Sequence, residues 1–280
     1  MNRHDSLVSP EWLEERLGDP DVRVVEVDVS DAAYNEGHIP GSVLWNIYRD
    51  LKDSEYRLRD VSALRDLMEA SGIAPSMTVV FYGYAPALGF WLLKLLRHPD
   101  ARILDATRAS WLEASRPWVT DQPTTDRATY PLPETDPHLR AGRAAVERAI
   151  DDPRQLILDV RTEAEYRGER FWPSGAPEEH GRAGHVPSAV NLPADLLYDT
   201  DGRFRQLHDL RDVVAQAGVG PEVTVIPYCT IGARAAATWF VLTHLLDHDH
   251  VTVYDGSWAE WGHCADTPVA VPTLSSPTTE

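Results

Sequence analysis

Short apolar runs alternate with helical patterns along most of the chain. Residues 22–29 and 156–160 have the length and composition of buried strands. A helix is predicted to begin after Ser9, because serine is a good N-cap and Pro10 suits the first helical position. Another helix is predicted over residues 143–150. Strands that alternate with helices predict an α/β fold with mainly parallel sheets flanked by helices.

The order of these patterns occurs twice, which is typical of an internal duplication. Corresponding stretches pair up as follows: residues 37–41 with 184–188, 78–82 with 224–228, 89–93 with 237–241, and 101–105 with 251–255. We therefore predict two tandem domains of the same architecture.

Composition places the boundaries of these domains. Residues 120–137 are rich in Pro, Thr and Asp and have almost no apolar periodicity, so they are predicted to form an extended linker. The first domain then covers residues 1–119 and the second covers residues 138–271. Residues 272–280 are rich in Ser, Thr and Pro and are predicted to be a disordered tail.

Charge and hydropathy exclude several classes of function. A net charge of -18 argues against nucleic acid or an anionic membrane as a partner, because both require a basic face. The longest apolar runs, such as residues 90–96, are too short to span a membrane, and the N-terminus lacks the apolar segment of a signal peptide. These features favour a cytoplasmic location.

The two cysteines, Cys229 and Cys264, are too few for a disulfide framework. No spacing of Cys and His is typical of a zinc site, and we expect neither a metal nor a cofactor. Cys264 is interpreted as an ordinary residue rather than a partner thiol for Cys229, because a disulfide would require a specific short separation.

Cys229 has the sequence context of a nucleophile. The apolar run 223–228 ends at this thiol, Gly232 follows, and a helical pattern begins near Arg234. Strand, loop and helix in this order place the thiol at the carboxyl edge of a parallel sheet, above a helix N-terminus, where open α/β sheets bind ligands. Unpaired N–H groups and the helix dipole favour the thiolate there. The hypothesis requires a sulfur that is ionised and reachable from solvent.

These motifs resemble the tandem-domain rhodanese family of sulfurtransferases. The resemblance rests on residues 228–234, on residues 254–262 and on the Gly-His-Ile-Pro-Gly box at 37–41. It implies that a cysteine in the second domain takes sulfane sulfur from thiosulfate or 3-mercaptopyruvate as a persulfide and passes it to cyanide or a thiol. Cys229 stands at the position of that cysteine. In the first half of the chain, Gly83 occupies the corresponding position. We therefore assign the first half a structural role and expect it to form one wall of the cleft.

The loop after Cys229 is expected to bind the small anionic donor. Backbone N–H groups of Thr230, Ile231, Gly232 and Ala233 can form a concave anion nest, and Gly232 permits a positive φ. Arg234 can either contact an oxyanion or brace the loop, since its planar fork suits both uses.

Supporting residues are expected around this loop. Asp159 is expected to organise it by accepting backbone hydrogen bonds, and Trp258 to line the cleft, although packing alone explains a tryptophan equally well. His185 recurs as His38 in the thiol-free half, which favours a structural role. The resemblance implies basic residues on the loop after the first long strand of the second domain, and Arg182 is the candidate for a second anion contact.

Three positions depart from the family pattern. Glu165 occupies a position where the family often has arginine, so the choice between thiosulfate and 3-mercaptopyruvate stays open. Ser188 replaces the usual glycine of the box, and residues 105–108 replace an expected Asp-Gly-Gly. We interpret the last two as loop adjustments.

The sequence leaves alternatives to a thiosulfate sulfurtransferase. A cysteine phosphatase or arsenate reductase of related fold would have one residue more between its cysteine and arginine than Cys229 and Arg234 have, and the tighter ring favours a single sulfur atom. A dedicated persulfide donor to a partner enzyme and a non-enzymatic interaction module both remain open. The physiological acceptor, including any acceptor protein, also stays open.

Overall fold

The computed structural model describes residues 6–271. In the first domain, five parallel strands form one sheet with the order β1-β5-β4-β2-β3. The strands are β1 (Leu7–Val8), β2 (Val22–Asp28), β3 (Val43–Asn46), β4 (Thr78–Gly83) and β5 (Asp100–Leu104). The helices are α1 (Pro10–Glu14), α2 (Ala32–Glu36), α3 (Val61–Ala70), α4 (Pro86–Leu95) and α5 (Arg108–Glu113), with a π-helical turn η2 (Ile47–Leu51).

The second domain repeats this strand order. Its strands are β6 (Arg140–Ala141), β7 (Gln155–Asp159), β8 (Val190–Asn191), β9 (Thr224–Tyr228) and β10 (Val253–Tyr254). The ladders β10-β6 and β8-β7-β9 are joined by a parallel bridge between Val225 and Val251. The helical elements are α6 (Arg143–Ala149), α7 (Glu163–Tyr166), η3 (Ala194–Leu197), α8 (Leu207–Gln216), α9 (Ala233–Phe240), η4 (Val241–Leu245) and α10 (Ser257–His263). The predicted α/β architecture of two similar units is confirmed.

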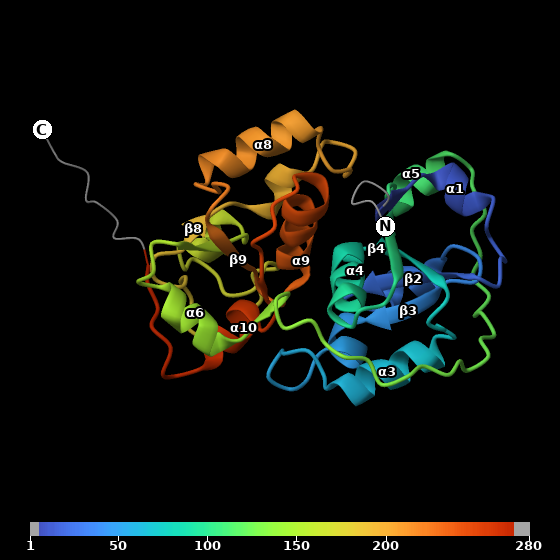
Figure 1. Ribbon diagram of the computed structural model, residues 1–280, viewed down its shortest axis with the longest axis horizontal. Coiled ribbons are helices and arrows are strands. Elements are labelled where there is room, and N and C mark those ends of the chain that lie inside the picture. Colours follow the sequence, from blue (N-terminus) through green and yellow to red (C-terminus); the bar gives the residue numbers. More distant parts are fainter. Residues whose placement is uncertain (1–5, 272–280) are drawn as a thin grey trace, which may run out of the picture.

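The two domains lie side by side and pack through α4 and α9, which face each other at the centre of the molecule (Figure 1). The ring of Phe90 on α4 contacts the rings of Trp239 and Phe240 on α9, with centroid distances of 6.1 and 5.1 Å. One cluster of buried apolar residues contains members of both domains. The loops at the carboxyl ends of β4 and β9 therefore meet at this interface.

The repeated box makes the same contacts in both domains. Each histidine ring stacks on a tyrosine ring and binds the carbonyl oxygen of that tyrosine. The next amide donates to the hydroxyl of a second tyrosine, in the last two residues of the central strand. The residues are Tyr34, His38, Ile39 and Tyr82 in the first domain, and Tyr166, His185, Val186 and Tyr228 in the second. His185 therefore holds together the fold of its domain.

The departures from the family pattern fit this backbone. Ser188 has a φ of 63°, close to the 75° of Gly41 in the first domain, so the serine adopts the left-handed conformation that the box requires. Thr107 caps α5 through reciprocal hydrogen bonds with Ser110. Both substitutions preserve the local chain path.

Residues 120–137, all described, form no helix or strand and run over the surface of the first domain (Figure 1). Within this segment the amide of Ala128 donates to the carbonyl oxygen of Glu69, and the hydroxyl of Tyr130 lies 2.8 Å from Nδ1 of His98. The predicted tail, residues 272–280, lies outside the described residues. Within residues 6–271 no helix has the length and apolar character needed to cross a bilayer.

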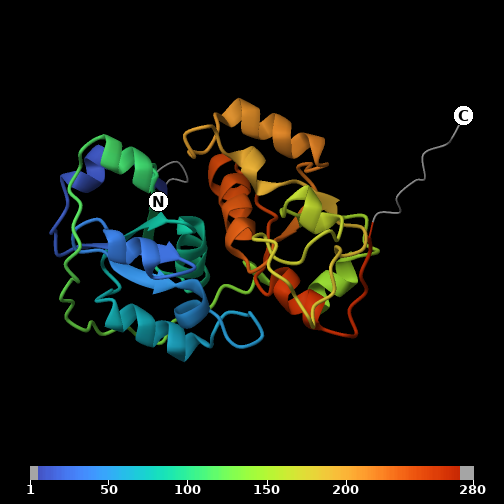
Figure 2. The same ribbon diagram turned by 180° about the vertical axis from the view of Figure 1, so that it is seen from behind.

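A second connection between the domains is made by residues 52–58, here called the interdomain arm. In both views this segment is a blue loop that leaves the first domain and reaches toward α10 (Figure 1 and Figure 2). The ring of Tyr56 stacks on His263 and contacts Trp172, each with a centroid distance of 5.8 Å. The arm begins beside Gly232 in the loop that follows β9, and the amide of Leu58 at its other end donates to the carboxylate of Asp255, after β10.

Candidate active site at Cys229

Cys229 lies directly between β9 and α9, as the sequence pattern predicts. Gly232 is the N-cap of α9, and its φ of 94° allows its amide to turn back and donate to Sγ of Cys229 at 3.1 Å. A Cβ at this position would lie 3.0 Å from the carbonyl oxygen of Asp255, so glycine also satisfies a close backbone approach. An amide that points at the sulfur at the start of a helix favours negative charge there.

The start of α10 anchors the loop from the other side. The amide of Cys229 donates to Oγ of Ser257 at 3.1 Å, and that hydroxyl donates to the carbonyl oxygen of Tyr254 at 2.8 Å. The amide of Trp258 in turn donates to the carbonyl oxygen of Cys229. Ser257 adopts a φ of 54°, a conformation uncommon for residues other than glycine. The backbone of Cys229 is thus held by both its N–H and its C=O.

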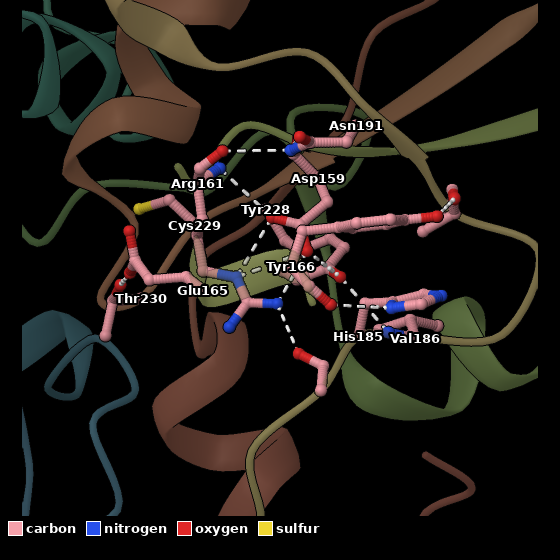
Figure 3. Close-up of polar contacts among 12 residues, drawn as sticks. Asp159, Arg161, Glu165, Tyr166, His185, Val186, Asn191, Tyr228, Cys229 and Thr230 are labelled. Atoms are coloured by element: carbon pink, nitrogen blue, oxygen red, sulfur yellow. Dashed lines mark hydrogen bonds and ion pairs between the residues drawn. The ribbon is translucent and has the colours of Figure 1, made fainter. Parts of the chain in front are cut away.

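A buried polar cluster supports the end of β9 (Figure 3). The hydroxyl of Tyr228 donates to Oδ2 of Asp159 at 2.5 Å, and burial raises the pKa of that hydroxyl well above its usual value, so it stays a donor. Asp159 also binds the guanidinium and the amide of Arg161, and both side chains are fully buried. Asp159 was expected to accept backbone hydrogen bonds from the loop. It accepts one, from Arg161, and reaches the loop through Tyr228.

Arg234 forms a two-point ion pair with Glu165. Both N···O distances are 2.9 Å, and the side chain of Glu165 is completely buried. Burial raises the pKa of Glu165, but the hydrogen bonds and charge of Arg234, with the hydroxyls of Thr230 and Thr162, outweigh burial and lower the pKa to about 2. Arg234 and Thr230 are also hydrogen-bonded, at 2.7 Å. These contacts brace the loop.

A cavity of about 700 Å³ opens beside Cys229 between the two domains. The second domain contributes the loop residues and part of residues 168–184, here called the insert after α7. The first domain contributes mainly aromatic side chains. The lining residues are Val29, Tyr48, Tyr56, Tyr84, Trp172, Pro173, Ser174, Ala176, Cys229, Thr230, Ile231, Ala233 and Arg234. The first domain therefore walls the cleft, as expected.

The sequence analysis requires a Cys229 sulfur that solvent can reach, and in the structure this residue is almost completely buried. Only 1% of Cys229 is exposed, so the residue is buried except where it faces the cavity. Such a site excludes water from a reactive sulfur.

Some of the expected site residues lie elsewhere. The guanidinium of Arg182 is hydrogen-bonded to carbonyl oxygens at the end of α10, including that of Thr267 at 2.8 Å, and it is absent from the described cavity lining. Trp258 is fully buried under the guanidinium of Arg161, 4.4 Å from its ring centroid, so packing explains it. Cys264 is a free thiol that contacts Arg143.

The structure also brings together residues that sequence reasoning missed. Ser257 lies in the motif at residues 254–262, but no feature of the sequence linked its hydroxyl to the amide of Cys229. Lys52 of the interdomain arm is buried at the carboxylate of Asp255, which also binds Arg140. The rarity of lysine in this chain was the one available signal for Lys52.

Comparisons with known proteins find relatives along almost the whole chain. The model of the rhodanese-like domain matches residues 9–114 and 143–264. The chain is 37% identical over 273 residues to the "Sulfur carrier protein TtuD" of Thermus thermophilus, covering 94% of this chain and 96% of that protein. It is 36% identical over 278 residues to a "Putative thiosulfate sulfurtransferase" of Saccharopolyspora erythraea, covering 97% and 98%.

Solved structures show the same fold. A complex of EanB Y353A with ergothioneine superposes with a TM-score of 0.85 at 23% identity, covering 96% of this chain and 71% of that one. At this identity the likeness concerns the fold.

Proposed function

The chain belongs to the rhodanese family, with two rhodanese-like domains, and on this premise we propose that it transfers sulfane sulfur from thiosulfate through a persulfide on Cys229. The names of its relatives support sulfur transfer in general. The identity of the donor, the identity of the acceptor and the roles of individual residues are what we propose here.

The chemistry has two half-reactions and leaves no net change in the enzyme. The Cys229 thiolate attacks the outer sulfur of thiosulfate, the S–S bond of thiosulfate breaks, and sulfite leaves with the bonding pair. The enzyme then carries Cys–S–S⁻. Cyanide or a thiolate attacks the terminal sulfur, thiocyanate or a new persulfide leaves, and the Cys229 thiolate is restored. This sequence predicts ping-pong kinetics.

The observation that carries the proposal is the hydrogen bond from the amide of Gly232 to Sγ of Cys229, at 3.1 Å. The donor is fixed by a glycine at a helix start, so it needs no reorganisation when the sulfur is negatively charged. Thr230, Ile231 and Ala233 line the cavity beside the sulfur, where their backbone can meet the donor's oxyanion.

The cavity favours a thiol over cyanide as the natural acceptor. A volume of about 700 Å³ far exceeds what cyanide fills and lies within the range of about 300–1,000 Å³ that organic ligands occupy. Tyr48, Tyr84 and Trp172 offer an apolar wall for such an acceptor. The name of the Thermus relative supports a variant of the same function, in which the persulfide is carried to a partner protein.

Mass spectrometry of the intact protein tests the proposal. After incubation with thiosulfate and gel filtration, the wild type should gain one sulfur atom, mapped by peptide analysis to Cys229, and lose it on addition of cyanide. Cys264→Ser serves as the matched control, because it removes the other thiol and should leave the gain intact. No added sulfur with thiosulfate or with 3-mercaptopyruvate would overturn the proposal. A gain with 3-mercaptopyruvate alone would reassign the donor.

A further inference from the structure

Lysine is rare in this chain, and one of its two lysines lies at the candidate active site. The two are Lys52 and Lys94, whereas arginine supplies almost all the other positive charge. The side chain of Lys52 is 1% exposed. A fully buried ammonium costs free energy unless it is paired, so its position calls for an explanation.

Lys52 belongs to the first domain, but the end of its side chain contacts the second domain. From the start of the interdomain arm, its Nζ donates to the carbonyl oxygen of Asp255 at 2.8 Å and lies 3.6 Å from Oδ2 of the same residue. A Cβ built on Gly232 would lie 3.4 Å from this Nζ. The ammonium is therefore directly behind the residue whose amide binds Sγ of Cys229.

The charges around Lys52 centre on the carboxylate of Asp255. Asp255 is the shared carboxylate of two cations, since Arg140 binds its Oδ1 at 2.6 Å in addition to Lys52. The amide of Leu58 also donates to Oδ2 of Asp255, at 2.8 Å. Lys52 and Asp255 form the buried ion pair, whereas the side chain of Arg140 is 36% exposed, so solvent partly screens this second positive charge.

The other cation beside the sulfur is already neutralised. Arg234 makes its two-point pair with Glu165, so its charge is largely balanced within the pair. Burial is the largest influence on Lys52 and lowers its pKa overall, and the nearby negative charge of Asp255 offsets this only in part. An ammonium and an anionic sulfur that lie close together stabilise each other's charge.

We propose that Lys52 is a positioning residue of the non-catalytic domain, which holds the Cys229 loop and supplies the positive charge that keeps the Cys229 sulfur, and then its persulfide, anionic. The persulfide part of this inference rests on the proposed function, whereas the thiolate part does not. The first domain then contributes to catalysis through the interdomain arm as well as walling the cleft.

The compact ammonium suits this role better than a guanidinium. Lys52 reaches the carbonyl oxygen of Asp255 through a buried apolar stem, whereas a planar guanidinium would need more space and more hydrogen-bond acceptors. In a chain that otherwise uses arginine, this requirement accounts for the lysine. Lys52→Arg is therefore expected to be a poor substitute even though it keeps the charge.

The test measures the reactivity of the thiol itself. The rate of alkylation by iodoacetamide is followed from pH 5 to 10 in a Cys264→Ser background, with folding checked by circular dichroism. The titratable or charged groups near Cys229 are Tyr48 in η2, Lys52 directly after η2, Tyr84 after β4, and Arg234 on α9. Lys52→Met removes one of these charges and leaves the others in place.

Lys52→Met should move the midpoint of the alkylation profile upward by about one pH unit, the lower limit for loss of a nearby opposite charge. Lys94→Met, which removes the other lysine from α4, should leave the midpoint unchanged. Arg140→Met should also move it upward but by less, because the guanidinium is partly exposed and solvent screens its charge. This milder variant keeps the inference testable if Lys52→Met fails to fold.

An unchanged midpoint in folded Lys52→Met, or in Arg140→Met where Lys52→Met is unfolded, would overturn the inference. So would an equal shift in Lys94→Met. Alkylation requires no sulfur donor, so this result is independent of whether thiosulfate adds sulfur to Cys229. Failure of the inference and failure of the proposed function are therefore distinguishable.

Discussion

Arg234 and Glu165 face each other at the edge of the cavity, with Nη1–Oε2 and Nη2–Oε1 distances of 2.9 Å each. Glu165 is the position at which the family resemblance led us to expect an arginine. In this chain the carboxylate instead neutralises Arg234 and fixes Thr230, the residue after Cys229. The sequence left Arg234 open between a substrate contact and a brace, and these distances favour the brace.

Glu165→Gln should destabilise the fold by about 3–5 kcal/mol at neutral pH, because it leaves a mostly buried guanidinium without its counter-charge. The pKa of Glu165 is lowered from 4.5 to about 2, so its contribution is complete above pH 4.5 and is lost as the pH falls toward 2. Urea unfolding should show that the free energies of unfolding of wild type and variant differ by a constant amount down to about pH 4.5. Below this pH the difference should become smaller. A gap that widens on acidification would contradict this.

Cys229→Ser should abolish thiocyanate formation from thiosulfate and cyanide while leaving thermal unfolding almost unchanged. The hydroxyl is close in size to the thiol and can still accept from the amide of Gly232, but at neutral pH it is not ionised and cannot carry a sulfane sulfur. The check is a colorimetric thiocyanate assay beside a melting curve. Activity retained by the serine variant would rule out Cys229 as the sulfur carrier.

Ala176→Trp should weaken the use of an organic thiol acceptor and leave the use of cyanide almost unchanged. Ala176 is exposed and lines the cavity from the insert after α7, so an indole there fills space without disturbing the core. We expect the KM for an organic thiol acceptor to rise about tenfold, which corresponds to about 1.4 kcal/mol, while the KM for cyanide changes little. Glu179→Trp, on the same insert but not among the described lining residues, is the control. Equal effects on both acceptors would contradict an acceptor role for the cavity.

Ser257→Ala and Ser257→Gly form a matched pair. Both remove the hydroxyl that accepts from the amide of Cys229, which should cost about 1–3 kcal/mol because that amide is buried. Glycine additionally relieves the positive φ of 54°, so Ser257→Gly should be more stable than Ser257→Ala by about 1 kcal/mol. Chemical denaturation gives both values. The reverse order would show that this backbone carries no conformational strain.

Much of the fold was predictable because its signals are local and occur twice. Apolar runs gave β2, β7 and β9, and Ser9 with Pro10 marked the start of α1, where the amide of Trp12 donates to Oγ of Ser9. The recurrence of His38 as His185 identified a structural histidine, because the half without a thiol needs the same box. The prediction for Arg182 relied on family analogy, and the structure places its guanidinium at the end of α10.

The sequence by itself determined that a thiol follows a strand and precedes a helix, because that order is encoded within a dozen neighbouring residues. Only the tertiary structure decided what surrounds the sulfur. Lys52 and Asp255 are 203 positions apart in the chain, and Tyr84 meets the Cys229 loop across a domain interface. Such contacts depend on how two folded units pack, and no local pattern carries that information, because the pairing of distant side chains is fixed by the shapes and charges of whole surfaces.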